Sequence, residues 1–193
     1  MAETKSASFT TVELVFIAIV GVVFGLLNNL FGIAYTAINA FNPWLALLFT
    51  PFGIVTLLAA YVVRKPGAAL LAGIINGLVQ FLAGNPAGLW SLVFGLAHGL
   101  GTELVFFLFR YKNYSWLACF LASFVDGLFN MVAVIFAFGL ISFTPLNQIF
   151  YMIALASVSS GVEAGFLGKI IGDLLNQTGL LKSFLISKQA KAV

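Results

Sequence analysis

The 193-residue chain is rich in apolar residues: 62% are hydrophobic and only 8% are charged. In soluble domains roughly a quarter of the residues are charged, so this composition excludes a water-soluble fold and indicates a membrane protein. The formal net charge of +3 comes from basic residues scattered between hydrophobic runs. That pattern is typical of a membrane orientation signal and excludes nucleic acid as a partner.

Six hydrophobic segments, separated by turn residues, are long enough to predict transmembrane helices, which need about 20 apolar residues each. The predicted helices cover residues 12–34, 44–63, 67–83, 89–109, 114–139 and 146–171. The expected fold is therefore all-α, a polytopic membrane protein with a bundle of six transmembrane helices. We predict a single membrane domain over residues 1–172 and a cytoplasmic tail over residues 173–193.

The first predicted helix combines a stripe of small residues with an amide near its outer end. Gly21 and Gly25 are four residues apart and Ala18 lies one turn earlier, a spacing that lets two helices approach closely. The stripe predicts either packing within the bundle or a docking surface for another membrane subunit. Asn28 lies at a depth where a polar group is costly, which makes it a candidate ligand-binding residue.

The connection between the first two helices, from Phe31 to Trp44, contains aromatic rings and amides. Tyr35, Asn39 and Trp44 suit a lid that stacks on a flat ligand and hydrogen-bonds its edge. An ordinary interfacial turn has the same composition. In the second helix, Pro51 lies inside the hydrophobic segment and predicts a kink.

The later helices carry further polar residues, which are candidate ligand-binding groups because lipid does not solvate them. Residues four apart share a helix face, so groups from several helices can converge on a central cavity. Each also has a structural interpretation, a hydrogen bond between helices that only fixes packing. The candidates are Asn76 and Gln80 on the third helix, Trp90, His98 and Glu103 on the fourth, and Asp126 and Asn130 on the fifth.

All nine lysines and arginines fall on one side of the membrane if the chain crosses it six times. These residues are Lys5, Arg64, Lys65, Arg110, Lys112, Lys169, Lys182, Lys188 and Lys191. By the positive-inside rule that side is the cytoplasm, so we predict a cell-membrane protein with both termini cytoplasmic. Lys169 is expected to pair with Glu163 or Asp173 on the same helix.

Nothing in the chain points to catalysis. The motifs GxxxxGK[ST], HExxH and GxSxG do not occur in it. His98 is the only histidine; it is more typical of a buried structural donor than of a metal ligand, although a haem could use it as an axial ligand. We therefore expect no enzyme activity, cofactor or metal, and a binding or transport role remains.

Motifs between Tyr61 and Tyr114 resemble those of the YkoE family, the substrate-binding (S) components of energy-coupling factor (ECF) vitamin transporters. The sequence RKPGAA begins at Arg64, GNPAG at Gly84 and HGLGTE at His98. The length of the chain and its six predicted spans also match S components in general.

The resemblance implies a high-affinity receptor for thiamin or its hydroxymethylpyrimidine moiety, without ATPase activity of its own. The implied partners are the vitamin ligand, a membrane-embedded coupling (T) subunit and two ATPase subunits or domains. By the same resemblance, Tyr35, Asn39 and Trp44 belong to a lid over the ligand, Gln80 and Trp90 to the pocket, and Ala18, Gly21 and Gly25 to docking on the T subunit.

Other functions remain open at this stage. Two positions depart from the family pattern, in which a carboxylate often replaces Gln80 and a glutamine often replaces His98. The ligand could therefore be a different flat aromatic micronutrient, including a haem held by His98. A stand-alone secondary transporter would use Glu103 or Asp126 as a proton relay, and an intramembrane enzyme or assembly factor is the third alternative.

Overall fold

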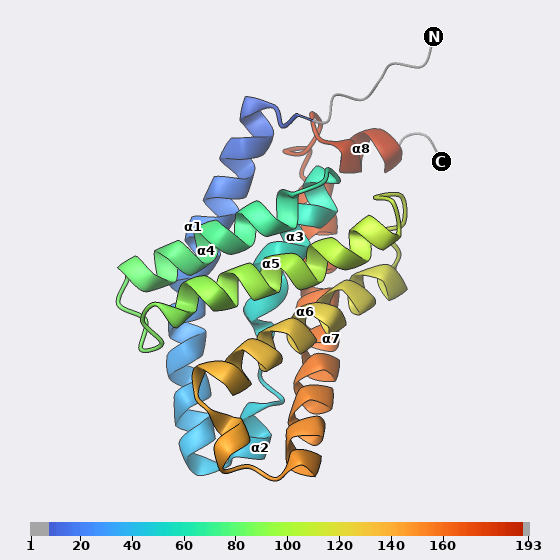
Figure 1. Cartoon of the computed structure of the whole chain (residues 1–193). Helices are drawn as coiled ribbons and strands as arrows, with labels where there is room; N and C mark the ends of the chain where they lie inside the picture. The colour runs from blue at the N-terminus through green and yellow to red at the C-terminus, as the bar shows by residue number, and fades with distance from the viewer. Residues whose placement is uncertain (1–7, 191–193) are drawn as a thin grey trace.

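The computed structural model of the chain describes residues 8–190, and every regular element in this range is a helix (Figure 1). The elements are α1 (Thr11–Phe41), α2 (Pro43–Ala46), η1 (Pro51–Gly53), α3 (Ile54–Val63), α4 (Ala68–Leu82), α5 (Trp90–Leu108), α6 (Trp116–Ala137), η2 (Leu140–Ser142), α7 (Leu146–Gln177) and α8 (Leu185–Ala190). The predicted all-α class is confirmed.

Five of the six predicted spans are long and apolar enough in the structure to cross a membrane: Thr11–Phe41, Pro43–Val63, Trp90–Leu108, Trp116–Ala137 and Leu146–Gln177. The sixth, α4, has 15 residues and is therefore about 22 Å long, less than the roughly 30 Å of a hydrocarbon layer. In Figure 1, α1 and α7 run along the long axis of the molecule, whereas α4 and α5 cross it obliquely.

The second hydrophobic segment, predicted as a span over residues 44–63, is interrupted. The short α2 is followed by non-helical residues and then by η1 and α3. Pro51 has no N–H to donate, and its ring disfavours a helical conformation at the preceding residue. Thr50 accordingly adopts φ −132° and ψ 50°, and what the sequence predicts as a kink is a separation into two helices. Residues 47–53 are called the break below.

The first helix is longer than predicted and replaces most of the expected outer connection. Residues 35–41 contain neither Pro nor Gly, so α1 continues to Phe41, its last residue, and Asn42 is its C-cap. The side chain of Asn42 then accepts hydrogen bonds from the N–H groups of Trp44 (2.9 Å) and Leu45 (3.3 Å), capping α2. Tyr35 therefore lies on a helix, and the prediction of a loop there is wrong.

Small residues bring α4 and α5 into close contact. A Cβ atom on Gly73 would lie 2.3 Å from the carbonyl oxygen of Gly95, and one on Gly95 would lie 2.3 Å from the carbonyl oxygen of Gly73. Gly77 and Gly99 extend the same contact along the two helices. Glycine is required at this crossing because any larger side chain would push the two backbones apart.

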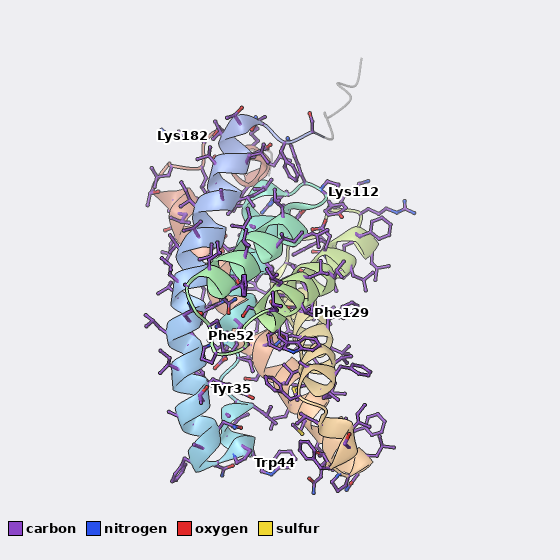
Figure 2. The ribbon with its side chains drawn as sticks, turned by 60° about the vertical axis from the view of Figure 1, so that its left-hand side comes forward. Tyr35, Trp44, Phe52, Lys112, Phe129 and Lys182 are labelled. Atoms are coloured by element: carbon purple, nitrogen blue, oxygen red, sulfur yellow. The ribbon has the colours of Figure 1, made fainter. Side chains whose placement is uncertain are left out.

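Described cations lie toward one end of the bundle, the end where α1 begins; Figure 1 shows α8 at the same end. Lys65 donates to the Glu13 carboxylate at 2.7 Å and to the carbonyl oxygen of Ser8 at 2.9 Å. Figure 2 shows Lys112 and Lys182 at this end and Trp44 at the opposite one. Lys5 and Lys191, which also entered the prediction of sidedness, lie outside the described residues. The cytoplasmic location of this end remains a prediction.

Candidate functional site

A chain of side-chain amides joins α1, α4 and the turn after α4. The Asn76 Oδ1 atom accepts from Gln80 Nε2 at 2.6 Å and from Asn28 Nδ2 at 3.3 Å. Asn85 Nδ2 donates to Gln80 Oε1 at 3.2 Å and to Asn29 Oδ1 at 2.6 Å. Amides combine a donor and an acceptor in one plane, so these linked side chains can exchange the hydrogen bonds among themselves for hydrogen bonds to a polar ring.

A buried ionisable pair lies beside the amides. His98 Nδ1, on α5, is hydrogen-bonded to Asp126 Oδ1, on α6, and the Asp126 side chain is fully buried. The other oxygen, Oδ2, has no hydrogen-bond partner among the described residues. It lies directly against Gly53, where an added Cβ atom would be only 1.8 Å from it. An unsatisfied carboxylate oxygen at membrane depth is costly, which marks this pair as a candidate for polar binding.

The break is held beside these groups by hydrogen bonds from three helices. Asn28 Nδ2 donates to the carbonyl oxygen of Phe52 at 3.2 Å, and the N–H of Thr50 donates to the Glu163 carboxylate at 2.5 Å. The hydroxyl of Thr56 bonds the carbonyl oxygen of Gly53 at 2.9 Å. Irregular backbone at membrane depth occurs only where protein groups satisfy it or where it borders a polar cavity.

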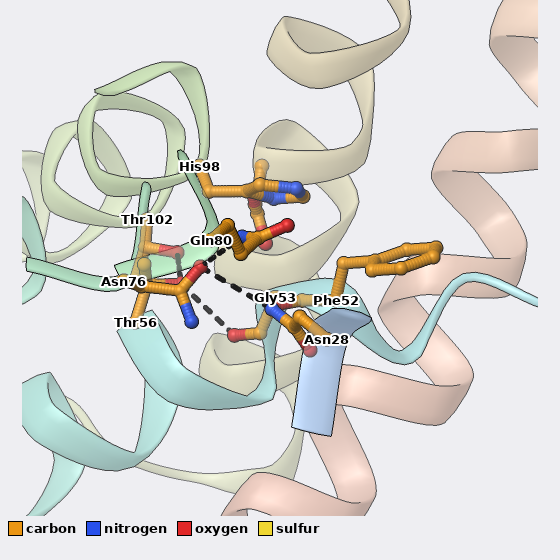
Figure 3. A network of polar contacts seen from close by, with 9 residues as sticks. Asn28, Phe52, Gly53, Thr56, Asn76, Gln80, His98 and Thr102 are labelled. Carbon is orange, nitrogen blue, oxygen red and sulfur yellow. Dashed lines mark hydrogen bonds and ion pairs between the residues drawn. The ribbon is translucent and has the colours of Figure 1, made fainter. Parts of the chain in front are cut away.

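We call Asn28, Asn76, Gln80, His98 and Asp126 the polar cluster; Figure 3 labels four of these residues around Gly53 and Phe52. Each of the five side chains is at most 9% exposed. The structure thus brings together five of the eleven residues that the sequence predicts as ligand-binding. Several buried polar atoms in and beside it have no hydrogen-bond partner among the described residues: Asn28 Oδ1, Asn76 Nδ2, Asp126 Oδ2, Asn130 Oδ1, and the hydroxyls of Ser157 and Ser160.

Aromatic residues cover the break on the side of α1. The Tyr35 ring is 6.1 Å from the Phe52 ring and Phe31 is 6.0 Å from Phe49, both edge to face. In Figure 3 the Phe52 ring points away from the amides. Tyr35 therefore lies beside the break and on a helix, and its role in a lid over the ligand stays a prediction.

The other predicted lid and pocket residues are exposed. Asn39 lies near the end of α1, Trp44 on α2 is 44% exposed, and Trp90 at the start of α5 is 41% exposed. Asn130 is half-buried on α6, four residues from Asp126. A role for these four residues in ligand binding stays a prediction.

Glu103, predicted to bind ligand, instead caps a helix. Its carboxylate accepts from the N–H groups of Gly67 (2.6 Å) and Ala69 (3.1 Å), at the start of α4, and from the Tyr111 hydroxyl (2.6 Å). The first N–H groups of a helix have no partner within it, and a carboxylate satisfies them well. Burial and the adjacent Glu103 carboxylate raise the pKa of the Tyr111 phenol well above its ordinary value, so Tyr111 remains a donor.

Gly53, Asn85 and Glu163 belong to the site although the sequence-based prediction omitted them. The sequence signal for the break is Pro51 together with Gly53, because proline and glycine both interrupt helices. Glu163 was expected to pair with Lys169, but its carboxylate binds Thr50 instead. Lys169 pairs with Asp173 at 2.9 Å, as predicted.

Comparisons with known proteins agree with this architecture. A family model described as the permease component of an ABC-type cobalt transport system matches residues 12–129. A solved structure, described as an S-component of an ECF transporter, superposes with a TM-score of 0.88 and is 32% identical, covering 96% of this chain and 94% of its own. The Bacillus subtilis (strain 168) protein YkoE, described as an HMP/thiamine permease protein, is 34% identical over 179 aligned positions, and the match covers 88% of this chain and 89% of YkoE. The chain belongs to the YkoE family. It is an S component of an ECF transporter, and the resemblance found in its motifs is confirmed.

Two of the three docking residues are not at the surface of this YkoE-family protein. Gly21 and Gly25 are buried, and an added Cβ on either would lie 2.7 Å from a side-chain atom of Ile75 or Val79 on α4. Of the two interpretations of this stripe, packing within the bundle agrees with the structure, because the missing side chains of both glycines let α1 pack on α4. A docking role for them stays a prediction. Ala18 is half-buried and borders an open hollow on the outer face of α1, so its docking role stays a prediction.

The polar cluster of the YkoE-family chain is buried in this structure. One open hollow on the described surface is bordered by Phe107 and Arg110 and another by Ala18 and Val22, and neither of these two borders the cluster. No group of three or more His, Cys, Asp or Glu side chains within residues 8–190 could hold a metal ion. His98 is buried and its Nδ1 atom is bonded to Asp126. A haem iron would bind the other ring nitrogen, Nε2, so the haem alternative stays open.

Proposed function

We propose that this S component captures hydroxymethylpyrimidine (HMP) or thiamin at the polar cluster beside the break. The observation that carries the proposal is the convergence of donors and acceptors from α1, α4, α5 and α6 beside the break, where the α-helix of the second segment is interrupted. Relatives add support, because the YkoE protein of Bacillus subtilis is described as an HMP/thiamine permease protein.

The chemistry of the cluster suits an aminopyrimidine ring. Such a ring is flat, carries acceptor nitrogens in its plane and donates from an exocyclic amine. The amides of Asn76 and Gln80 offer both donors and acceptors in a plane, and the Asp126 oxygen without a partner can accept from the amine. A charge-assisted hydrogen bond of this kind is worth about 1.5–3 kcal/mol.

The break provides the route to the cluster. Gly53 covers the free oxygen of Asp126, so a ligand reaches that atom only when the break moves. Among the described residues, the side chains of Glu163, Asn28 and Thr56 hold the backbone of residues 47–53. The break lacks the continuous series of α-helical hydrogen bonds that would resist the movement. Ligand entry is then from the end that carries α2, opposite to the cations.

An S component needs partner subunits to carry its ligand across the membrane. The captured vitamin is passed to the cytoplasm with a T subunit and two ATPase subunits or domains, which supply the energy; the chain itself is not an enzyme. In this arrangement the cation-bearing end and both termini face the cytoplasm, in agreement with the positive-inside rule. A proton relay through Glu103, as a secondary transporter requires, is disfavoured because this carboxylate caps α4.

The proposal is tested by isothermal titration calorimetry of the purified protein with thiamin and with HMP, in the absence of nucleotide. The wild type should bind at least one of them, and Asp126→Asn should weaken binding tenfold or more, about 1.4 kcal/mol. Asp173→Asn is the matched control, since Asp173 pairs with Lys169 near the C-terminal end of α7 and is not part of the polar cluster, and it should bind as the wild type does. Unchanged affinity in Asp126→Asn would reject the site, and absence of binding to either compound would reject the proposed substrates.

A further inference from the structure

The end of α5 and the turn after it form a surface that combines apolar side chains with cations. Phe107 is 63% exposed and Leu108 is 68% exposed. Together with Arg110 and Tyr111 they line an open hollow of about 540 Å³. Arg110 and Lys112, in the turn, are both exposed. The hollow therefore has two apolar walls and a cation beside it.

The positive charge of this turn is not neutralised by the protein. Neither Arg110 nor Lys112 forms an ion pair within the described part of the chain. The Glu103 carboxylate contacts Tyr111 but already accepts three hydrogen bonds, from that hydroxyl and from two N–H groups of α4. An anion from outside the protein would therefore find donors here that have no acidic partner.

The position of the surface along α5 decides what kind of anion fits it. The membrane-span candidate Trp90–Leu108 ends at this hollow, so the side chains of Phe107 and Leu108 lie at the depth of lipid acyl chains and Arg110 and Lys112 at the depth of headgroups. Cations placed just outside a span attract anionic lipids. A free phosphate would gain nothing from the apolar walls.

We propose that this hollow binds one anionic phospholipid of the leaflet at the cation-bearing end. Its phosphate contacts Arg110 and Lys112, and one acyl chain lies along Phe107 and Leu108. The site is separate from the polar cluster and does not depend on which vitamin the protein captures.

The test is native mass spectrometry of the protein released from nanodiscs that contain equal amounts of phosphatidylglycerol and phosphatidylcholine. The wild type should retain one phosphatidylglycerol after the loosely bound lipids are removed. In the double variant Arg110→Gln/Lys112→Gln, the preference for phosphatidylglycerol should fall by about fivefold for each cation removed. Both side chains are exposed, so the variant should keep the melting temperature of the wild type.

Lys182→Gln is the matched control, because Lys182 is an exposed cation at the same end of the bundle (Figure 2). It should retain the lipid as the wild type does; equal loss in this control would show a general charge effect and overturn the proposal. Equal retention in the double variant would overturn it as well. Displacement of the lipid by millimolar glycerol 3-phosphate would identify a site for free anions instead.

Discussion

Gly53 and Asp126 illustrate how closely single residues are fitted at the polar cluster. The carboxylate oxygen of Asp126 occupies the space where any other residue at position 53 would place its Cβ atom. The same carboxylate bonds His98, so a side chain at position 53 would disturb three elements at once. Gly53 therefore has two roles: its backbone forms part of the break, and its lack of a side chain leaves room for the buried Asp126 carboxylate.

At this scale we predict that Gly53→Ala destabilises the protein. Overpacking of a closely packed site costs about 1–3 kcal/mol, because either Asp126 or the break must shift. The melting temperature of the purified protein, measured by intrinsic fluorescence, should fall by several degrees. Gly32→Ala is the matched control on α1, since its Cβ would meet only the side-chain amide of Asn85 at 3.8 Å. Equal melting temperatures for the wild type and Gly53→Ala would contradict the observed fit.

The break is the element that distinguishes this bundle from a set of continuous helices. Its backbone needs partners from other helices, and Glu163 on α7 supplies one by accepting the N–H of Thr50. That partner lies 113 residues away in the chain, so the break depends on α7 for this hydrogen bond.

At the scale of elements we predict that Glu163→Ala loosens the break while Glu163→Gln does not. Glutamine keeps an acceptor oxygen at the same reach, whereas alanine leaves the N–H of Thr50 without its partner. Loss of a hydrogen bond to a charged group, about 1.5–3 kcal/mol, should make amide hydrogen exchange in residues 47–53 at least tenfold faster. Exchange in this segment that is equally slow in all three proteins would show that Glu163 does not hold it.

The elements also show what the sequence could and could not predict. Hydrophobicity predicted that the apolar segments are helical, because lipid leaves an unpaired backbone no alternative to helix, and five of them are long enough in the structure to span a membrane. Hydropathy did not predict where α1 ends, since a helix can continue from the membrane into the interface. Asn42 and Pro43 mark that end better than hydropathy does. The sequence also did not reveal that Glu103 caps α4, because the N–H groups that Glu103 caps lie more than 30 residues earlier in the chain.

For the site, the sequence predicted which polar residues are buried but not how they are connected. Spacing of four placed Asn76 and Gln80 on one face, and they are hydrogen-bonded in the structure. The pairing of His98 with Asp126 depends on how α5 crosses α6, which no local pattern specifies. The small-residue stripe of α1 had two interpretations, and only the packing of α4 against Gly21 and Gly25 distinguished them.

Over the whole molecule, charge and polarity are separated along the long axis. Lys112 and Lys182 lie toward the end with α8, Trp44 lies at the other, and Phe52, beside the polar cluster, lies between them (Figure 2). A receptor that takes a ligand from one side and meets its partners on the other requires such a division. The break lies between the α2 end and the cluster, which places the proposed entrance on the side without cations.

The most direct test is a crystal structure of the protein with HMP or thiamin bound. We predict that the pyrimidine ring lies at the polar cluster, with a nitrogen within about 3 Å of Asp126 or of the Asn76 and Gln80 amides, and that Gly53 has moved away from the Asp126 carboxylate. A ligand bound elsewhere, with the cluster still closed as it is now, would contradict the account.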